Sequence, residues 1–225
     1  MKALHRTHIG SRDENEDRLY ASESLFAVVD GMGGHACGGE AAQVAVEGVA
    51  RSEVQTASEL VSLVCNLHKD VVRMGLREHC RNTAAVIVTA LFQGTQIHIC
   101  WAGDSRAYRL RDGTLTLLTR DHNLYEGYKM TMGEDRAKKL NPHLAAQIVV
   151  FLGGGDPDPI EPEIRSFDVK AGDRYLLCSD GVYGQMGEKE MTRCLSSDSP
   201  CENLETEALK KPMSDNVTSV VVFVE

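Results

Sequence analysis

Two apolar segments of this chain each run into an Asp-Gly pair. Leu25–Val29 leads into Asp30-Gly31, and Tyr175–Ser179 leads into Asp180-Gly181. Short runs of this kind predict buried strands, so each aspartate is expected where a strand ends at the edge of a sheet. A carboxylate there is a hard oxygen ligand, and the glycine leaves the backbone free to bend close to an ion. The two motifs predict a fold that brings these strand ends together.

Predicted strands follow one another in runs, rather than alternating strictly with helices. The strands are expected over Leu25–Asp30, Thr83–Phe92, Gln96–Cys100, Arg106–Leu110, Thr114–Leu118, Ile164–Val169, Arg174–Cys178 and Thr218–Val224. Helices are expected over Glu40–Ala50, Ser58–Val72, Glu188–Leu195 and Asn203–Lys211. This order favours an α+β layered fold with a largely antiparallel sheet over a doubly wound fold.

Three further segments carry turn or loop signals. Asp112-Gly113 predicts a tight hairpin between two strands. His5–Tyr20 is polar and is predicted to be rich in turns. Asp121–Pro162 contains several prolines and the run Gly153-Gly154-Gly155, and it predicts a mobile insertion with a short helix around Glu134–Leu140.

The bulk composition limits the kind of protein. A chain of 225 residues with 42% hydrophobic content is ample for one buried core and short for two, which predicts a single domain over residues 1–225. The net charge of −9 argues against nucleic acid or an anionic membrane as the main partner. Met1–Arg6 lacks the apolar stretch of a signal peptide, and no run is long enough to span a membrane. A cytoplasmic monomer is expected.

The cysteines are odd in number, 7 in all, and no Cys-x-x-Cys pair occurs. The sequence therefore predicts neither a disulfide framework nor a structural zinc site. Several cysteines lie in apolar runs, where a thiol behaves as a small hydrophobic side chain. Cys178 is interpreted in this way, since no phosphate-binding cysteine loop surrounds it.

Further acidic residues extend the two strand-end motifs into a candidate metal cage. Glu16-Asp17 lies upstream of Asp30, and Asp215-Asn216 lies downstream of Asp180. Asp30 has two oxygens with which to bridge two ions, and Gly31 can offer its carbonyl because no side chain crowds it. Two divalent ions about 4 Å apart would hold and acidify a bridging water and neutralise the charge of a phosphoryl group.

Each of these residues also has an ordinary structural interpretation. Most aspartates before glycine close a turn or cap a helix, and this interpretation applies to Asp112. Asp104, in Gly103-Asp104-Ser105-Arg106, is also interpreted as part of a turn between strands. The same interpretation is weaker for Asp30 and Asp180 because both end strongly apolar strands. Arg12 taken alone, before an acidic pair, would be a surface salt bridge.

Six motifs nevertheless occur together in a fixed order. They are Arg12-x-x-x-Glu16-Asp17, Val29-Asp30-Gly31-Met32-Gly33-Gly34-His35, Gly103-Asp104-Ser105-Arg106, Thr119-x-Asp121-His122, Cys178-Ser179-Asp180-Gly181 and Asp215-Asn216-Val217-Thr218. The set resembles the metal-dependent type 2C protein serine/threonine phosphatases, in a form that looks bacterial, and it covers nearly the whole chain. The resemblance implies a four-layer α-β-β-α sandwich of two antiparallel sheets flanked by helix pairs, with metals at one end.

The resemblance also implies the role of each matching residue. The metal ligands that it implies are Glu16, Asp17, Asp30, Gly31, Asp121, Asp180 and Asp215. Asp30 would bridge two Mn²⁺ or Mg²⁺ ions, and Asp121 with Asp180 would help to hold a third, weaker ion. Arg12 matches the phosphate-binding arginine, whose planar fork contacts two phosphate oxygens at once. A bridging hydroxide would then attack phosphorus in line, without a phosphoenzyme.

Two parts of the resemblance leave alternatives open. Met32 stands where many eukaryotic relatives carry a histidine proposed as general acid, and methionine cannot donate a proton. His35 is chemically suited to that role, but it is equally well interpreted as a surface residue, and a metal-bound water is a third source of the proton. The stretch Tyr125–Pro159 corresponds to a flap beside the active site, which predicts a flap-like insertion around residues 125–160 that sets specificity.

The expected function is a Mn²⁺/Mg²⁺-dependent phosphatase that removes phosphate from Ser or Thr of phosphorylated proteins and opposes a bacterial Ser/Thr kinase. One alternative is a pseudophosphatase that works as a binding module, although all the matched acidic positions are present. The other alternative is a metal-dependent hydrolase of small phosphoesters. Comparable rates on phosphopeptides and simple metabolites would favour the latter.

Overall fold

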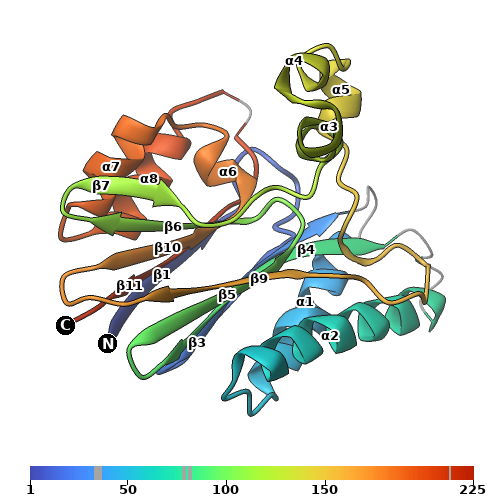
Figure 1. Ribbon diagram of the computed structural model, residues 1–225, viewed down its shortest axis with the longest axis horizontal. Coiled ribbons are helices and arrows are strands. Elements are labelled where there is room, and N and C mark those ends of the chain that lie inside the picture. Colours follow the sequence, from blue (N-terminus) through green and yellow to red (C-terminus); the bar gives the residue numbers. More distant parts are fainter. Residues whose placement is uncertain (33–36, 78–79, 81–82, 213) are drawn as a thin grey trace.

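Strands buried on both faces require a layer of structure on each side. β4 (Ala84–Gln93) is such a strand, with every residue buried except the last. The computed structural model describes residues 1–32, 37–77, 80, 83–212 and 214–225. In it, two antiparallel sheets stack face to face, and helices cover both outer faces (Figure 1). The predicted α+β sandwich of layers α-β-β-α is confirmed.

Each sheet combines strands from distant parts of the chain. The first sheet has the order β1 (Lys2–His8), β11 (Val217–Phe223), β10 (Arg174–Cys178), β6 (Arg106–Arg111) and β7 (Thr114–Leu117). The second has the order β2 (Asp17–Ala21), β3 (Leu25–Met32), β4, β5 (Gln96–Ala102) and β9 (Glu163–Asp168), and β8 (Leu152–Gly153) pairs with β4. Asp112 and Gly113 both have positive φ, 50° and 75°, so the predicted tight hairpin joins β6 to β7.

Aromatic side chains fasten the two sheets to each other. The layer between the sheets contains Phe26, Trp101 and Tyr175, all fully buried. Phe92 packs edge-on against Phe26 of its own sheet and against Tyr175 of the other, with ring centroids 5.8 and 5.5 Å apart. These contacts fix how the strand ends of one sheet face those of the other.

The outer helices follow the predicted apolar periodicity. α1 (Gly38–Ala50) and α2 (Ala57–Arg77) cover the second sheet, and α6 (Asp180–Tyr183), α7 (Glu188–Leu195) and α8 (Pro200–Ala208) lie on the first (Figure 1). α2 buries Leu60, Val64, Leu67 and Val71, which recur on one face of a helix. None of the helices in the part of the chain that the structure describes has the length and apolarity of a membrane span.

The N-terminal segment differs from its prediction. His5–Tyr20 was expected to be turn-rich, but β1 occupies its start and β2 its end. Among the strands that the structure describes, β1 pairs only with β11. It is mostly exposed, so its sequence lacks the apolar alternation of a buried strand. Pairing with a partner strand, rather than burial, makes this segment a strand.

The insertion after β7 also differs from its prediction. It contains α3 (Leu124–Met132), α4 (Glu134–Ala137) and α5 (Pro142–Ala145), whereas one short helix around Glu134–Leu140 was expected. These helices project above the sandwich (Figure 1). α3 buries no side chain, so no apolar period marks it; instead Asn123 caps it by accepting a hydrogen bond from the Glu126 N–H at 2.9 Å.

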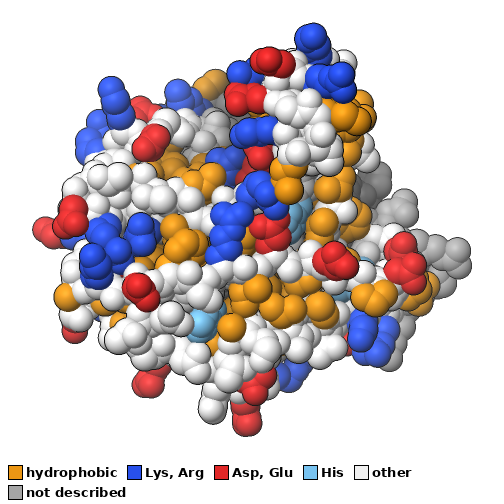
Figure 2. All heavy atoms as spheres, in the orientation of Figure 1, with side chains coloured by type: hydrophobic (Ala, Val, Ile, Leu, Met, Phe, Trp, Pro, Cys, Tyr) orange, Lys and Arg blue, Asp and Glu red, His pale blue; other side chains and the backbone are white. Residues whose placement is uncertain are grey.

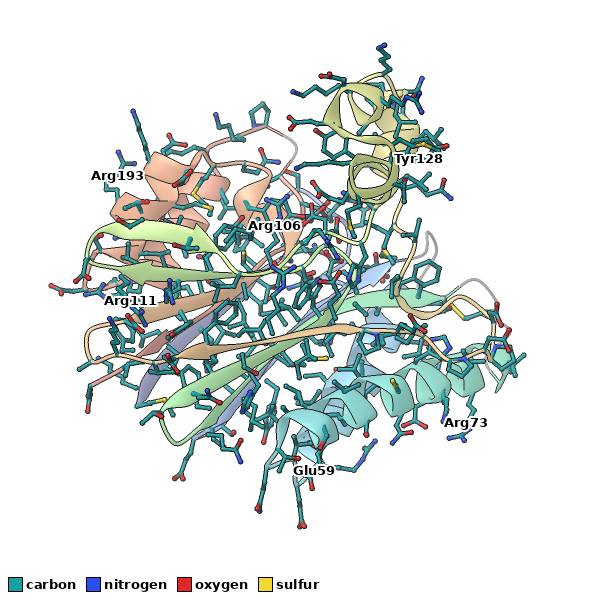
Figure 3. All side chains as sticks on the ribbon, viewed as in Figure 1. Glu59, Arg73, Arg106, Arg111, Tyr128 and Arg193 are labelled. Carbon is teal, nitrogen blue, oxygen red and sulfur yellow. A yellow bond between two sulfur atoms is a disulfide. The ribbon has the colours of Figure 1, made fainter. Side chains whose placement is uncertain are left out.

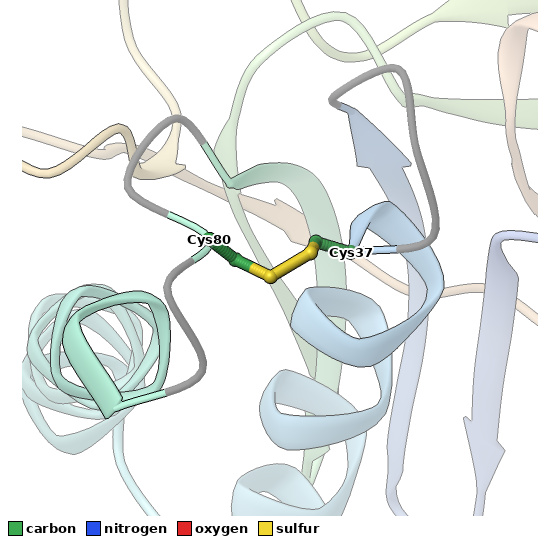
Figure 4. Close-up of a disulfide and its surroundings, with 2 residues drawn as sticks. All are labelled: Cys37 and Cys80. Carbon is green, nitrogen blue, oxygen red and sulfur yellow. A yellow bond between two sulfur atoms is a disulfide. The ribbon is translucent and has the colours of Figure 1, made fainter.

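A disulfide joins Cys37 to Cys80 (Figure 4), which corrects the expectation of no disulfide. The two residues are 43 positions apart, so their spacing carries no signal. They approach because β3 and β4 are paired, with Met32 opposite Ala84. Cys178, in contrast, is the buried core thiol that the sequence predicts.

Candidate metal centre

Five aspartates lie near one another at one end of the sandwich. Asp17, the first residue of β2, lies directly opposite Asp30 of β3 in the antiparallel register. The other members follow or precede strands at the same end; they are Asp104 after β5, Asp180 after β10 and Asp215 before β11. Charges within this set raise the pKa values of Asp17, Asp30, Asp104 and Asp180, as expected for a cluster of carboxylates.

Asp17 is the most deeply buried member, with 1% of its surface exposed. The Ser179 hydroxyl donates to its Oδ2 at 2.7 Å, whereas its Oδ1 has no hydrogen-bond partner. Burial raises the pKa of Asp17 to about 6, against the opposing effect of the hydrogen bonds from Ser179 and Thr218. A buried carboxylate oxygen without a partner is costly, and a bound cation would satisfy it.

The neighbouring carboxyls are destabilised in the same way. Burial raises the pKa of Asp30 well above its usual value, and the charges of Asp17 and Asp180 raise it further. The pKa of Asp180 is also raised, first by burial and then by Asp215. A bound divalent cation such as Mn²⁺ or Mg²⁺ relieves such repulsion among carboxylates. The residues therefore fit a site for Mn²⁺ or Mg²⁺.

The backbone of Gly31 is packed too closely to carry a side chain. A Cβ there would lie 2.1 Å from the carbonyl oxygen of Gly38, at the start of α1. A Cβ on Gly38 would in turn lie 2.5 Å from Oε1 of Glu16, and the Gly31 N–H donates to the Glu16 carbonyl at 3.2 Å. The end of β3, the start of α1 and Glu16 thus form one tightly packed wall of the cluster.

Asn216 holds the loop that carries Glu16. Its Oδ1 accepts from the Glu16 N–H at 2.8 Å, and its Nδ2 donates to the carbonyls of Ile9 and Glu14 at 2.8 and 2.9 Å. Sequence reasoning gave Asn216 no role of its own. The only available signal was its place beside Asp215, just before a β-branched strand.

Arg12 lies at the open side of the cluster. It forms an ion pair with Asp215, Nη2 to Oδ2 2.5 Å, and 58% of its side chain is exposed. Its positive charge also lowers the pKa of Asp180, against the larger effect of burial. The salt bridge that a lone arginine would predict is therefore present, but its partner belongs to the acidic cluster.

Asp121 has a partner of its own. Both of its oxygens accept hydrogen bonds from Arg106, at 2.8 and 2.7 Å. Arg106, labelled in Figure 3, lies over the ring of Tyr183 at 3.7 Å, and the Tyr183 hydroxyl donates to the Asp104 carbonyl at 2.9 Å. Asp121 is thus held beside the cluster by a bidentate ion pair.

Asp104 lies in the bend between β5 and β6, as its interpretation as a turn residue predicts, but it is also buried beside the acidic cluster. Burial, together with the charges of Asp180 and Asp121, raises its pKa to about 6. It follows the buried strand β5, which is the same strand-end signal that identified Asp30 and Asp180. His35, the candidate general acid, lies outside the described residues.

Comparisons with known proteins agree with this geometry. The family model described as protein phosphatase 2C matches residues 6–218. The chain is 29% identical over 231 residues to the serine/threonine protein phosphatase PstP of Mycobacterium tuberculosis, covering 95% of this chain but only 43% of that protein. It is also 29% identical over 213 residues to the serine/threonine phosphatase stp of Listeria monocytogenes, covering 88% of this chain and 84% of that one.

A solved structure shows the same arrangement of the chain. The catalytic domain of PstP, crystallised in complex with two manganese ions, superposes with a TM-score of 0.84 at 30% identity, over 98% of this chain and 96% of that one. The chain thus spans less than half of the full-length mycobacterial relative, but nearly all of this catalytic domain. On the extent of the family match and of this superposition, the chain belongs to the protein phosphatase 2C family.

Proposed function

We propose that this chain is a Mn²⁺- or Mg²⁺-dependent protein serine/threonine phosphatase. The observation that carries the proposal is the set of buried, mutually repelling carboxylates, with the unpartnered Asp17 Oδ1 among them and Arg12 at their open side. Its relatives PstP and stp bear the name serine/threonine phosphatase, and PstP has been crystallised with two manganese ions.

The proposed ligand set keeps the residues expected from the sequence except Asp121, which Asp104 replaces. Two ions would be held by the carboxylates of Glu16, Asp17, Asp30, Asp180 and Asp215 and by the Gly31 carbonyl. For a third, weaker ion the sequence implied Asp121 with Asp180. Because Arg106 occupies both oxygens of Asp121, we place Asp104 beside Asp180 at that position and assign Asp121 to holding Arg106.

Bound ions supply two things to the chemistry: neutralisation of the phosphoryl charge and a water of lowered pKa. The side chains supply the rest. Arg12 exchanges its contact with Asp215 for two phosphate oxygens, which its exposure permits. Ser179 orients Asp17 through one oxygen and leaves the other free for a ligand. Asn216 fixes the Glu16 backbone, so that the carboxylates stay in place during turnover.

The expected substrates are Ser/Thr-phosphorylated proteins in the cytoplasm, in a signalling pathway with a bacterial Ser/Thr kinase, and the enzyme is expected to act as a monomer. We treat residues 1–225 as one catalytic domain, in which α3–α5 form the flap over residues 125–160. On the face drawn in Figure 2, basic and acidic side chains gather between the sandwich and this flap. Arg120 and Asp121 lie in the segment that leads into it and form ion pairs with Glu163 of β9 and Arg106 of β6.

The test is release of phosphate from a phosphothreonine peptide, in Mn²⁺ and in EDTA. Asp180→Asn should lower the metal-dependent rate by more than about 100-fold, since a ligand change exceeds the effect of altering its supporting residues. Asp112→Asn is the matched control, because this aspartate lies in the β6–β7 turn. No release by folded wild type in either metal would favour the pseudophosphatase, and equal rates on simple phosphoesters would favour the small-molecule hydrolase.

A further inference from the structure

The Cys37–Cys80 disulfide lies where β3 and β4 part. Met32 is paired with Ala84, Cys37 follows β3, and Cys80 precedes β4 (Figure 4). Cys80 is fixed on its own side, since its N–H donates to the Gly75 carbonyl and its carbonyl accepts from the Thr83 N–H, both at 2.9 Å. The bond therefore ties the start of α1 to an anchored segment at the end of the sheet that carries Asp30.

The start of α1 is also part of the metal-centre wall. Cys37 is the N-cap of this helix, and Gly38 is its first residue. The Gly38 carbonyl packs against Gly31, and the Gly38 Cα faces the Glu16 carboxylate so closely that a Cβ would lie 2.5 Å from Oε1. A displacement of Cys37 would move Gly38. Because Gly38 packs against both, the Gly31 carbonyl and the Glu16 carboxylate, which are proposed metal ligands, would move with it.

We propose that Cys37 and Cys80 form a reversible redox site that controls the affinity of the metal centre. The disulfide holds Gly38 against Gly31 and Glu16 and gives the form that binds divalent ions tightly. Reduction releases Cys37 from its anchor and weakens that binding. The inference goes beyond the phosphatase activity; it rests on the proposed metal ligands and not on the substrate.

The bond is accessible to reductants. Cys37 and Cys80 are half-buried, whereas Cys100, Cys178 and Cys194 are buried. An external dithiol would break the S–S bond by exchange: each sulfur takes up one electron and one proton, and the dithiol loses two of each as it closes its own disulfide. In a reducing compartment disulfides are generally transient and serve redox sensing, which agrees with the proposed location.

The experiment compares Mg²⁺ binding by the oxidised and reduced protein with calorimetry. Mg²⁺ is chosen because thiols bind it poorly, whereas the Cys37, Glu40 and Cys80 ligand atoms lie within 4.8 Å of one another and would attract a softer ion. Reduction should weaken Mg²⁺ binding about 5- to 20-fold. By linkage, saturating Mg²⁺ should make the disulfide harder to reduce in a glutathione buffer by the same factor.

Variants separate this effect from a general loss of structure. The double variant Cys37→Ser/Cys80→Ser should bind Mg²⁺ like reduced wild type and ignore reductant. Cys65→Ser, which changes a half-buried cysteine outside the disulfide, should keep the full response. If the double variant does not fold, the reduced wild type provides the same measurement.

Two results would overturn the proposal. One is a thiol titration that finds Cys37 and Cys80 free in the air-oxidised protein, and the other is equal Mg²⁺ affinity in both redox forms. Neither measurement depends on catalytic turnover. Both would therefore still test the redox proposal if the phosphatase assignment were wrong. Conversely, an active phosphatase with redox-independent Mg²⁺ affinity would remove the redox site alone.

Discussion

The two sides of the acidic cluster are built by different means. On the side of β2, β3 and α1, Gly31 and Gly38 are positioned by close backbone packing, and the Ser179 hydroxyl orients the buried Asp17. On the open side, Arg12 and the pair Arg106–Asp121 are positioned by ion pairs between side chains, and that of Arg12 is largely exposed. Packed backbone tolerates little displacement, whereas exposed ion pairs exchange partners at low cost. Ligand geometry is thus fixed on one side, and substrate contact is adjustable on the other.

The largest effect should come from adding a methyl group to the packed side. Gly31→Ala would place Cβ 2.1 Å from the Gly38 carbonyl oxygen, so the backbone must shift. We expect a loss of about 1–3 kcal/mol in the free energy of unfolding, together with loss of Mn²⁺ binding and activity. Thermal denaturation and Mn²⁺ titration of the variant would measure both.

The matched control outside the cluster is Gly127→Ala in α3. No atom lies within 4 Å of a Cβ built there, and alanine is the better helix former. This variant should be stabilised by up to about 1 kcal/mol and should bind Mn²⁺ like wild type. A Gly31→Ala protein that binds Mn²⁺ normally would remove the distinction between the two sides.

The second largest effect is a pH dependence of the metal-free protein. Asp17 has a pKa of 3.8 when unfolded and about 6 when folded, so the folded state binds more protons between these values. The free energy of unfolding in EDTA should therefore fall as pH rises through this window, by up to about 3 kcal/mol. Asp104, whose pKa is also raised to about 6, acts in the same direction.

Melting in EDTA at about pH 5 and about pH 7.5 tests this sign. Asp17→Asn should reduce the dependence because it removes one of the titrating groups, and Mn²⁺ should raise the melting temperature most at the higher pH. Stability that rises with pH in EDTA, or that is indifferent to Mn²⁺, would contradict a buried repelling cluster.

A smaller effect on Mn²⁺ binding is expected from the residue that joins the two sides. Asn216→Ala removes the hydrogen bonds to Glu16, Ile9 and Glu14, which should cost about 1–3 kcal/mol of stability and weaken Mn²⁺ binding. Asn203→Ala is the control, because Asn203 lies in α8 and its side-chain amide donates a hydrogen bond to the Ser197 hydroxyl, away from the acidic cluster. The control should leave Mn²⁺ affinity unchanged; equal effects of both variants on that affinity would reduce Asn216 to a general stabilising residue.

The sequence predicts the buried part of the site better than the rest. Asp30 and Asp180 are recognisable because an apolar strand precedes each, and burial is what sequence patterns record. Asp104 carries the same signal after β5, yet its Gly-Asp-Ser context is also that of a turn. The roles of Asn216 and Cys37 depend on contacts with segments distant in sequence, which no local pattern encodes. β1 escaped prediction because it is paired but exposed.

The smallest effect on stability, and the sharpest test of the adjustable side, is Arg12→Ala. Because 58% of the Arg12 side chain is exposed, its ion pair with Asp215 should contribute less than about 1 kcal/mol, so the melting temperature should barely change. Phosphate recognition should suffer more: loss of a bidentate contact should weaken inhibition by inorganic phosphate and raise KM about tenfold. Arg12→Lys should recover the positive charge but not the bidentate contact. Its phosphate affinity and KM should therefore lie between those of Arg12→Ala and of wild type. A variant that loses stability while keeping wild-type phosphate affinity would assign Arg12 to the scaffold, because only a phosphate-binding arginine changes affinity while the fold is preserved.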